Sequence, residues 1–214
     1  MQFGKVMVLT VASATLLSAC ARDGEVDPTG GVTVTRSACP AVGVPAQTGD
    51  VTLFNPPSSR DSRAIDVVAS ITNLRSTCTE GASELGVNAT FEVQARRQSA
   101  GGAREVILPY FATVVQGGRI VVSKRVSRVA IRFEDGQLRA TGAGSGGATV
   151  NRAAATLPAE IQQRITRKRK AGDADAAIDP MSDPQVREAV ARASFELLIG
   201  FQLTQDQLRY NATR

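Results

Sequence analysis

The feature that most constrains the fold is a ten-residue segment in which apolar and polar residues alternate strictly. The apolar positions are Val87, Ala89, Phe91, Val93 and Ala95, and the polar ones are Asn88, Thr90, Glu92, Gln94 and Arg96. Successive side chains of a β-strand point to opposite faces, so this pattern predicts a strand with one buried face and one face in water.

Other segments of the chain also have strand character. They are residues 65–72, 106–115 (one bulged strand or two short ones), 119–126, 128–133 and the apolar segment 195–203. The pairs Gly117-Gly118 and Asp135-Gly136 are turn signals, and no crossover helices separate the strands before residue 150. We therefore expect an antiparallel β-sandwich of immunoglobulin or fibronectin type. The chain has no Trp, so the likeness is to the architecture and not to a named family.

The C-terminal third is expected to add helices to this sandwich. The sequence predicts helices near 158–170 and 184–193, the second with Asp183 as N-cap and Pro184 in its first turn. The late strand near 195–203 follows, and Thr204 caps a last short helix. We place all of this in one domain, residues 50–214. The glycine-rich segment 142–147 has no helix or Lys-Ser/Thr after it, so we interpret it as a flexible hairpin loop.

The N-terminus has the pattern of an export signal. Lys5 precedes a 12-residue, mostly apolar stretch that ends in Leu17-Ser18-Ala19-Cys20. About 20 apolar residues are needed to span a bilayer, and this stretch is shorter. The register of Leu17, the small pair and Cys20 resembles the lipobox of bacterial lipoproteins.

This resemblance implies the location of the protein. It implies removal of the signal peptide, residues 1–19, acylation of Cys20 with fatty acids such as palmitate, and attachment to a membrane. Residues 20–49 are rich in Gly and Pro and predict an extended tether. By resemblance to enteric bacteria, Ala21 after the lipidated residue favours the outer membrane, with the domain facing the periplasm. The whole chain, including its Arg-Tyr-Asn-Ala-Thr-Arg end, looks similar to alphaproteobacterial lipoproteins to which we can attach no activity.

Once Cys20 is assigned to the lipid, two of the three cysteines remain. In an oxidising compartment, Cys39 and Cys78 are expected to form a disulfide. It would close a loop of about 40 residues and stabilise the fold by about 4 kcal/mol in the chain-entropy treatment. The chain has no His, so two cysteines cannot complete a closed four-ligand zinc site. We expect no metal and no cofactor.

The residue inventory argues against catalysis. Without His, the Ser-His-Asp and Cys-His arrangements are excluded, and no Ser-x-x-Lys sequence provides a substitute. We therefore expect no catalytic residues and no enzymatic activity. A small hydrolase that uses carboxylates, such as Glu80 and Glu84, is kept as the third hypothesis.

Basic residues are the best candidates for binding. The net charge is +5 and the isoelectric point is near 9.6, and export argues for anionic lipids, glycans or acidic proteins as partners instead of nucleic acid. One set, which we call the helix-end cluster, comprises Arg164, Arg167, Lys168, Arg169 and Lys170. A second set comprises Lys124, Arg125, Arg128, Arg132 and Arg139, of which Lys124, Arg128 and Arg132 share parity and would form one outward row unless a bulge intervenes.

Each basic set also has a structural interpretation, and the sequence leaves both open. Cations suit the last turn of a helix, where they complement the macrodipole. The acidic run Asp173, Asp175, Asp179 and Asp183 does not have calcium-loop spacing, so we interpret it as a loop that neutralises the basic helix end.

Besides the hydrolase, the sequence supports two functional hypotheses, both of which rank above it. The first is a lipid-anchored, non-catalytic envelope protein that binds or scaffolds another envelope protein. The alternative is a module that binds a polyanion, such as lipopolysaccharide or an acidic glycan, through the basic sets.

Overall fold

The computed structural model of the chain describes residues 36–169 and 172–213. The lipobox, Cys20 and Lys170 lie outside the described residues. Within them, no helix is both long enough and apolar enough to cross a bilayer.

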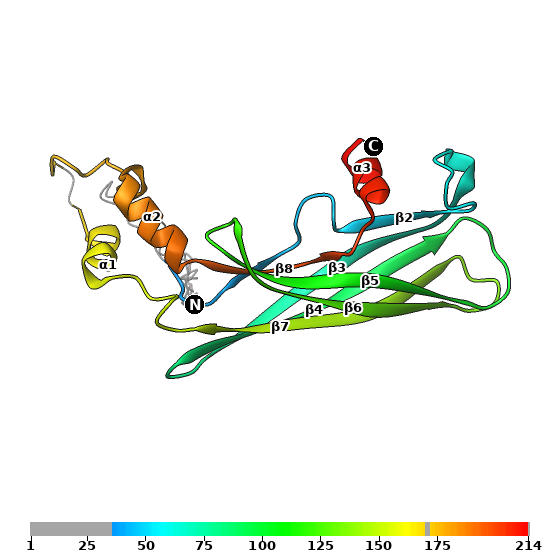
Figure 1. Ribbon diagram of the computed structural model, residues 1–214, viewed down its shortest axis with the longest axis horizontal. Coiled ribbons are helices and arrows are strands. Elements are labelled where there is room, and N and C mark those ends of the chain that lie inside the picture. The colour runs from blue at the N-terminus through cyan, green and yellow to red at the C-terminus, as the bar shows by residue number, and fades with distance from the viewer. Residues whose placement is uncertain (1–35, 170–171, 214) are drawn as a thin grey trace, which may run out of the picture.

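The protein is a sandwich of two four-stranded sheets, as the sequence predicts (Figure 1). The first sheet has the order β1 (Ala41–Gly43), β8 (Phe195–Phe201), β5 (Arg104–Gln116) and β6 (Ile120–Phe133). The second has the order β2 (Asp50–Phe54), β3 (Ile65–Glu80), β4 (Glu84–Arg97) and β7 (Arg139–Asn151). All strand pairs are antiparallel except β1 with β8, which is parallel.

Strand β4 reproduces the alternation of its sequence. Its five apolar residues, Val87, Ala89, Phe91, Val93 and Ala95, are each at most 5 % exposed, and the polar residues between them are exposed. They meet the inner face of the other sheet, to which Ile131 of β6 and Ile199 of β8 contribute. Full burial of each large aliphatic side chain stabilises the fold by about 1.5–3 kcal/mol.

The late strand joins the sandwich, and the helices lie outside it. β8 inserts between β1 and β5. At one end of the sheets lie α1 (Ala159–Thr166), a 3-10 turn (Pro180–Ser182) and α2 (Pro184–Ala193), and α3 (Gln205–Thr213) lies beside β2 (Figure 1). The predicted caps are present: Asp183 accepts from the Gln185 amide at 2.8 Å, and Thr204 Oγ1 from the Gln207 amide at 3.2 Å. A second 3-10 turn, Ser62–Ala64, precedes β3.

Two sequence predictions about strands are wrong. The segments 119–126 and 128–133 form the single strand β6. The glycine-rich segment 142–147 is not a loop but the middle of β7. A Cβ on Gly146 would lie 2.8 Å from the Ala112 Cβ, and one on Gly144 would overlap the ring of Phe91. These glycines therefore make room for side chains of the core, and that demand comes from distant parts of the chain.

The predicted tether ends earlier than residue 49. Residues 41–43 form β1 and pair with β8, so this part of the segment belongs to the folded domain. The Sγ atoms of Cys39 and Cys78 are 2.10 Å apart, the distance of a disulfide bond, and the predicted pairing is confirmed. The pair joins the start of β1 to β3 of the other sheet.

Candidate functional site

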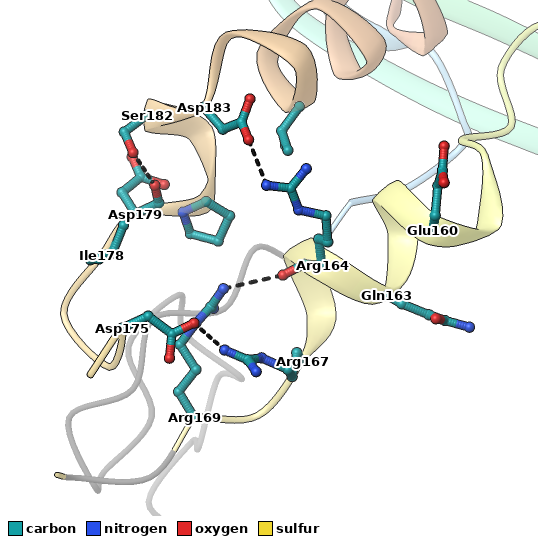
Figure 2. A pocket seen from close by; sticks show the side chains of 12 residues that line it. Glu160, Gln163, Arg164, Arg167, Arg169, Asp175, Ile178, Asp179, Ser182 and Asp183 are labelled. Carbon is teal, nitrogen blue, oxygen red and sulfur yellow. Dashed lines mark hydrogen bonds and ion pairs between the residues drawn. The ribbon is translucent and has the colours of Figure 1, made fainter. Parts of the chain in front are cut away.

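Three arginines of the helix-end cluster, Arg164, Arg167 and Arg169, line a cavity of about 660 Å³ between α1, the 3-10 turn at 180–182 and the start of α2 (Figure 2). Helix α1 is anchored by Ile161 and Ile165, which are buried. It ends at Thr166 and not near residue 170, and Arg167 is already extended, with φ −60° and ψ 122°. The cations after Thr166 therefore lie beyond the last helical turn, where their side chains can still reach the carbonyl groups at the end of α1.

Carboxylates of the acidic loop pair with the arginines of this cavity. An Arg164 nitrogen is 2.5 Å from a carboxylate oxygen of Asp183. Asp175 pairs with Arg167 and, at 3.5 Å, with Arg169. Figure 2 shows the Arg167 and Arg169 side chains converging on Asp175. The Arg169 side chain is only 7 % exposed, and it also donates to the Arg164 carbonyl at 3.3 Å.

Two aspartates of the same run also cap helical turns. Asp179 accepts a hydrogen bond from the Met181 amide at 2.8 Å. Asp183 accepts from the Gln185 amide, and this bond, together with the one from Arg164, holds the pKa of Asp183 below its usual range. The acidic run thus has structural roles at this end of the domain. No group of three or more metal-ligating side chains occurs within the described residues.

The charged side chains that line this cavity carry one more negative than positive charge. The basic groups that line it are Arg164, Arg167 and Arg169, and the acidic groups are Glu160, Asp175, Asp179 and Asp183. Lys168 is exposed and does not line the cavity. A cavity with more carboxylates than guanidinium groups offers a polyanion no net attraction. The geometry favours the interpretation that the acidic loop neutralises the basic segment.

The outward row on β6 forms as the sequence predicts. Lys124, Arg128 and Arg132 stand opposite Thr113, Pro109 and Glu105 of β5, which are four residues apart and lie on the same face. The register shift of β6 comes before them, at Val121–Ser123. Lys124 Nζ lies 5.1 Å from the centre of the Phe111 ring. Arg132 pairs with Glu134 at 3.1 Å.

The other two members of the second basic set lie elsewhere. Arg125 points to the opposite face of β6 and lines a shallow cavity of about 490 Å³ with residues 147–149 of β7. Arg139 begins β7 and stands directly opposite Arg96 of β4. The second set is therefore divided among three places.

The sequence analysis missed the exposed apolar residues of β6. Ile120, Val121, Val122 and Val126 are each between 54 % and 61 % exposed. Strand β6 is the last in its sheet and pairs with β5 alone among the described strands. The run Ile120-Val121-Val122 does not alternate with polar residues. Three consecutive apolar residues in a strand put apolar groups on both faces, and this pattern could have predicted exposed apolar side chains.

The carboxylates kept for the hydrolase hypothesis are placed as follows. Glu80 pairs with Arg152 at 3.3 Å, and Glu84 is exposed at the start of β4.

Comparisons with models of protein families, with curated proteins and with solved structures gave no match to this chain.

Proposed function

We propose that this protein is a lipid-anchored, non-catalytic component of the cell envelope that binds or scaffolds another envelope protein. In this proposal the lipid on Cys20 holds it in the outer membrane, with the domain in the periplasm. Its partners are the membrane, through the anchor, and an envelope protein.

One observation carries the binding part of the proposal. The first nine residues of β6, 120–128, are all exposed, and four of them are large aliphatic residues. Scattered apolar residues are ordinary on a protein surface, but a contiguous apolar patch with a polar rim is typical of an interaction site. On the face of Val126 the polar neighbours are Lys124 and Arg128, and Arg125 points to the opposite face of β6.

The experiment places a photo-crosslinking amino acid at Val122 in cells of the species that encodes the protein. We expect one or two discrete covalent adducts with other proteins after irradiation. The matched control has the same amino acid at Gln94, which is exposed on the opposite sheet, and should give none. Adducts at neither position, or equal smears at both, would contradict the proposal.

The outward row on β6 favours a second candidate function, binding of a polyanion such as lipopolysaccharide or an acidic glycan. Among the described residues, neither Lys124 nor Arg128 has an ion-pair partner. The test is binding of purified lipopolysaccharide to the wild type and to Lys124→Gln/Arg128→Gln. The candidate predicts a loss of about tenfold at low salt and a weakening of wild-type binding as salt is raised. Equal binding by both proteins would remove it.

A further inference from the structure

The free edge of β6 is limited to its first two thirds. At its C-terminal end, β7 approaches β6 so closely that a Cβ on Gly142 would lie 2.8 Å from the Ala130 carbonyl oxygen. Before Val129 every residue of β6 is exposed. An extended segment of nine residues, 120–128, is thus open at its edge, with a length of about 30 Å.

An open edge of this kind carries unpaired backbone groups. In an edge strand, alternate N–H and C=O groups point away from the only neighbouring strand, and they offer a template for a further strand. Proteins usually protect such edges with charges, proline, short strands or bulges. β6 has cations and one bulge at Val121–Ser123, but it is 14 residues long and has four exposed aliphatic residues.

The charges of this edge select between occupants. The residues of β6 include four cations, Lys124, Arg125, Arg128 and Arg132, and no Asp or Glu. If two copies paired antiparallel about Val126, Lys124 of each would stand opposite Arg128 of the other. Like charges directly opposite in a sheet are destabilising. The cations therefore oppose pairing with a second copy in the register that joins the whole segment 120–128, and they favour an acidic strand.

We propose that the β6 edge between Ile120 and Arg128 binds an extended, acidic segment of another envelope protein as an additional β-strand. This inference rests on the proposed function and specifies how the partner binds. Main-chain hydrogen bonds provide affinity in such complexes, and alternate side chains provide specificity. Lys124 and Arg128 lie on one face with Val126 between them. The partner has acidic residues four apart on that face and an apolar residue between them.

The probe is a labelled peptide, Thr-Val-Thr-Glu-Thr-Val-Thr-Glu-Thr-Val, titrated with the full chain in detergent and followed by fluorescence anisotropy. A second peptide has Lys in place of both Glu. A third keeps both Glu but has Pro in place of the Val between them, which removes a donor and disfavours the strand. We expect the first peptide to bind about tenfold more tightly than each of the others.

Variants locate the binding on β6. Lys124→Gln/Arg128→Gln should weaken the Glu peptide at least about fivefold, and Val126→Thr should weaken it by a smaller factor. The matched control is Arg96→Gln/Arg139→Gln, which removes two exposed cations from the other sheet. It should change the affinity by less than about twofold. The three-peptide comparison on the wild type needs no variant and holds even if a variant folds poorly.

Several outcomes would overturn the inference. If the Glu and Pro peptides bind equally well, β6 attracts any acidic chain whether or not it forms a strand. This is the behaviour of a polyanion site. Sedimentation as a dimer that excludes the Glu peptide would show that a second copy occupies the edge. If no peptide binds but Val122 still forms a discrete adduct in cells, strand addition is wrong and the proposed function stands. If both fail, both are wrong.

Discussion

Two regions of this protein are rich in basic residues, but their basic side chains have different partners. At the helix end, Arg164, Arg167 and Arg169 are paired with carboxylates of a loop that follows directly in the chain. On β6, Lys124 and Arg128 stand opposite two uncharged residues of β5, Thr113 and Pro109. The first region uses its charge to hold two helices and a loop together, and the second presents its charge to solvent.

The difference shows that formal charge alone does not identify a binding site. The helix-end cluster has more cations in a row, yet each described arginine of the cluster has an anionic partner within the domain. A paired cation must give up that partner before it can bind a ligand, whereas an unpaired one at the surface need not. The set on β6 has fewer cations and is more dispersed, but it is the better candidate.

The largest expected effect comes from breaking the helix-end pairing. Asp175→Asn leaves Arg167 and the buried Arg169 without their shared carboxylate. Because Arg169 is buried while Asp175 is partly exposed, we expect unfolding to become easier by about 1–3 kcal/mol, measured by urea titration. The control is Asp206→Asn, which removes an exposed partner of Arg60 and Arg209 and should cost less than about 0.5 kcal/mol. Equal losses would contradict a special role for Asp175.

Asp175→Asn should also leave the helix end with an exposed cation that has no carboxylate partner, as on β6. With Asp175 neutral, Arg167 is released at a position where its side chain is already more than half exposed. We expect binding to vesicles that contain phosphatidylglycerol to increase about fivefold at low salt, since a basic residue near an anionic surface contributes about 1 kcal/mol. Cosedimentation measures it. Unchanged binding by Asp175→Asn would mean that local pairing does not control which region is available.

Sequence patterns predicted the parts of this molecule that depend on local structure. The alternation of β4 and the capping residues Asp183 and Thr204 are properties of short segments, and the structure has them as predicted. The neutralising role of the acidic loop could also be inferred, because Asp175 is only eight residues from Arg167.

The failures concern contacts between distant segments. Gly144 and Gly146 looked like a loop because the side chains that require them, Phe91 and Ala112, lie on other strands. The exposure of Val121 and Val122 depends on β6 being the last strand of its sheet, which no local pattern states. The early end of α1 at Thr166 is a different kind of failure, because the arginines after it bind the acidic loop that follows in the chain.

The pH dependence of the two regions should differ. The pKa of Asp183 is lowered, first by the hydrogen bond from the Gln185 amide and then by Arg164. A carboxylate with a lowered pKa in the folded state stabilises the fold above the pKa of an unfolded Asp, about 4, and this contribution is lost as the pH falls through the lower folded value. The difference in urea midpoint between the wild type and Asp183→Asn should therefore shrink below about pH 4.

A matched comparison for this prediction comes from β6, whose residues include no acid. The difference in urea midpoint between the wild type and Lys124→Gln/Arg128→Gln should stay constant over the same pH range. If it shrinks in parallel with that of Asp183→Asn, the acid effect is global and does not report on the helix end.

The smallest expected effect is on the stability of the β6 edge itself. Lys124→Gln/Arg128→Gln removes two exposed cations that have no ion-pair partner among the described residues, so the free energy of unfolding should fall by at most about 1 kcal/mol. The contact of Lys124 with the Phe111 ring accounts for most of that loss. Arg128 stands opposite the uncharged Pro109, so removing its charge breaks no pairing across the strands. Urea titration of this variant checks the expectation.

The comparison is the variant Arg164→Gln/Arg167→Gln at the helix end. We expect it to lose more free energy of unfolding, because both of its arginines have carboxylate partners. A larger loss at β6 than at the helix end would show that the β6 cations stabilise the fold, and would remove the reason to regard them as a binding surface.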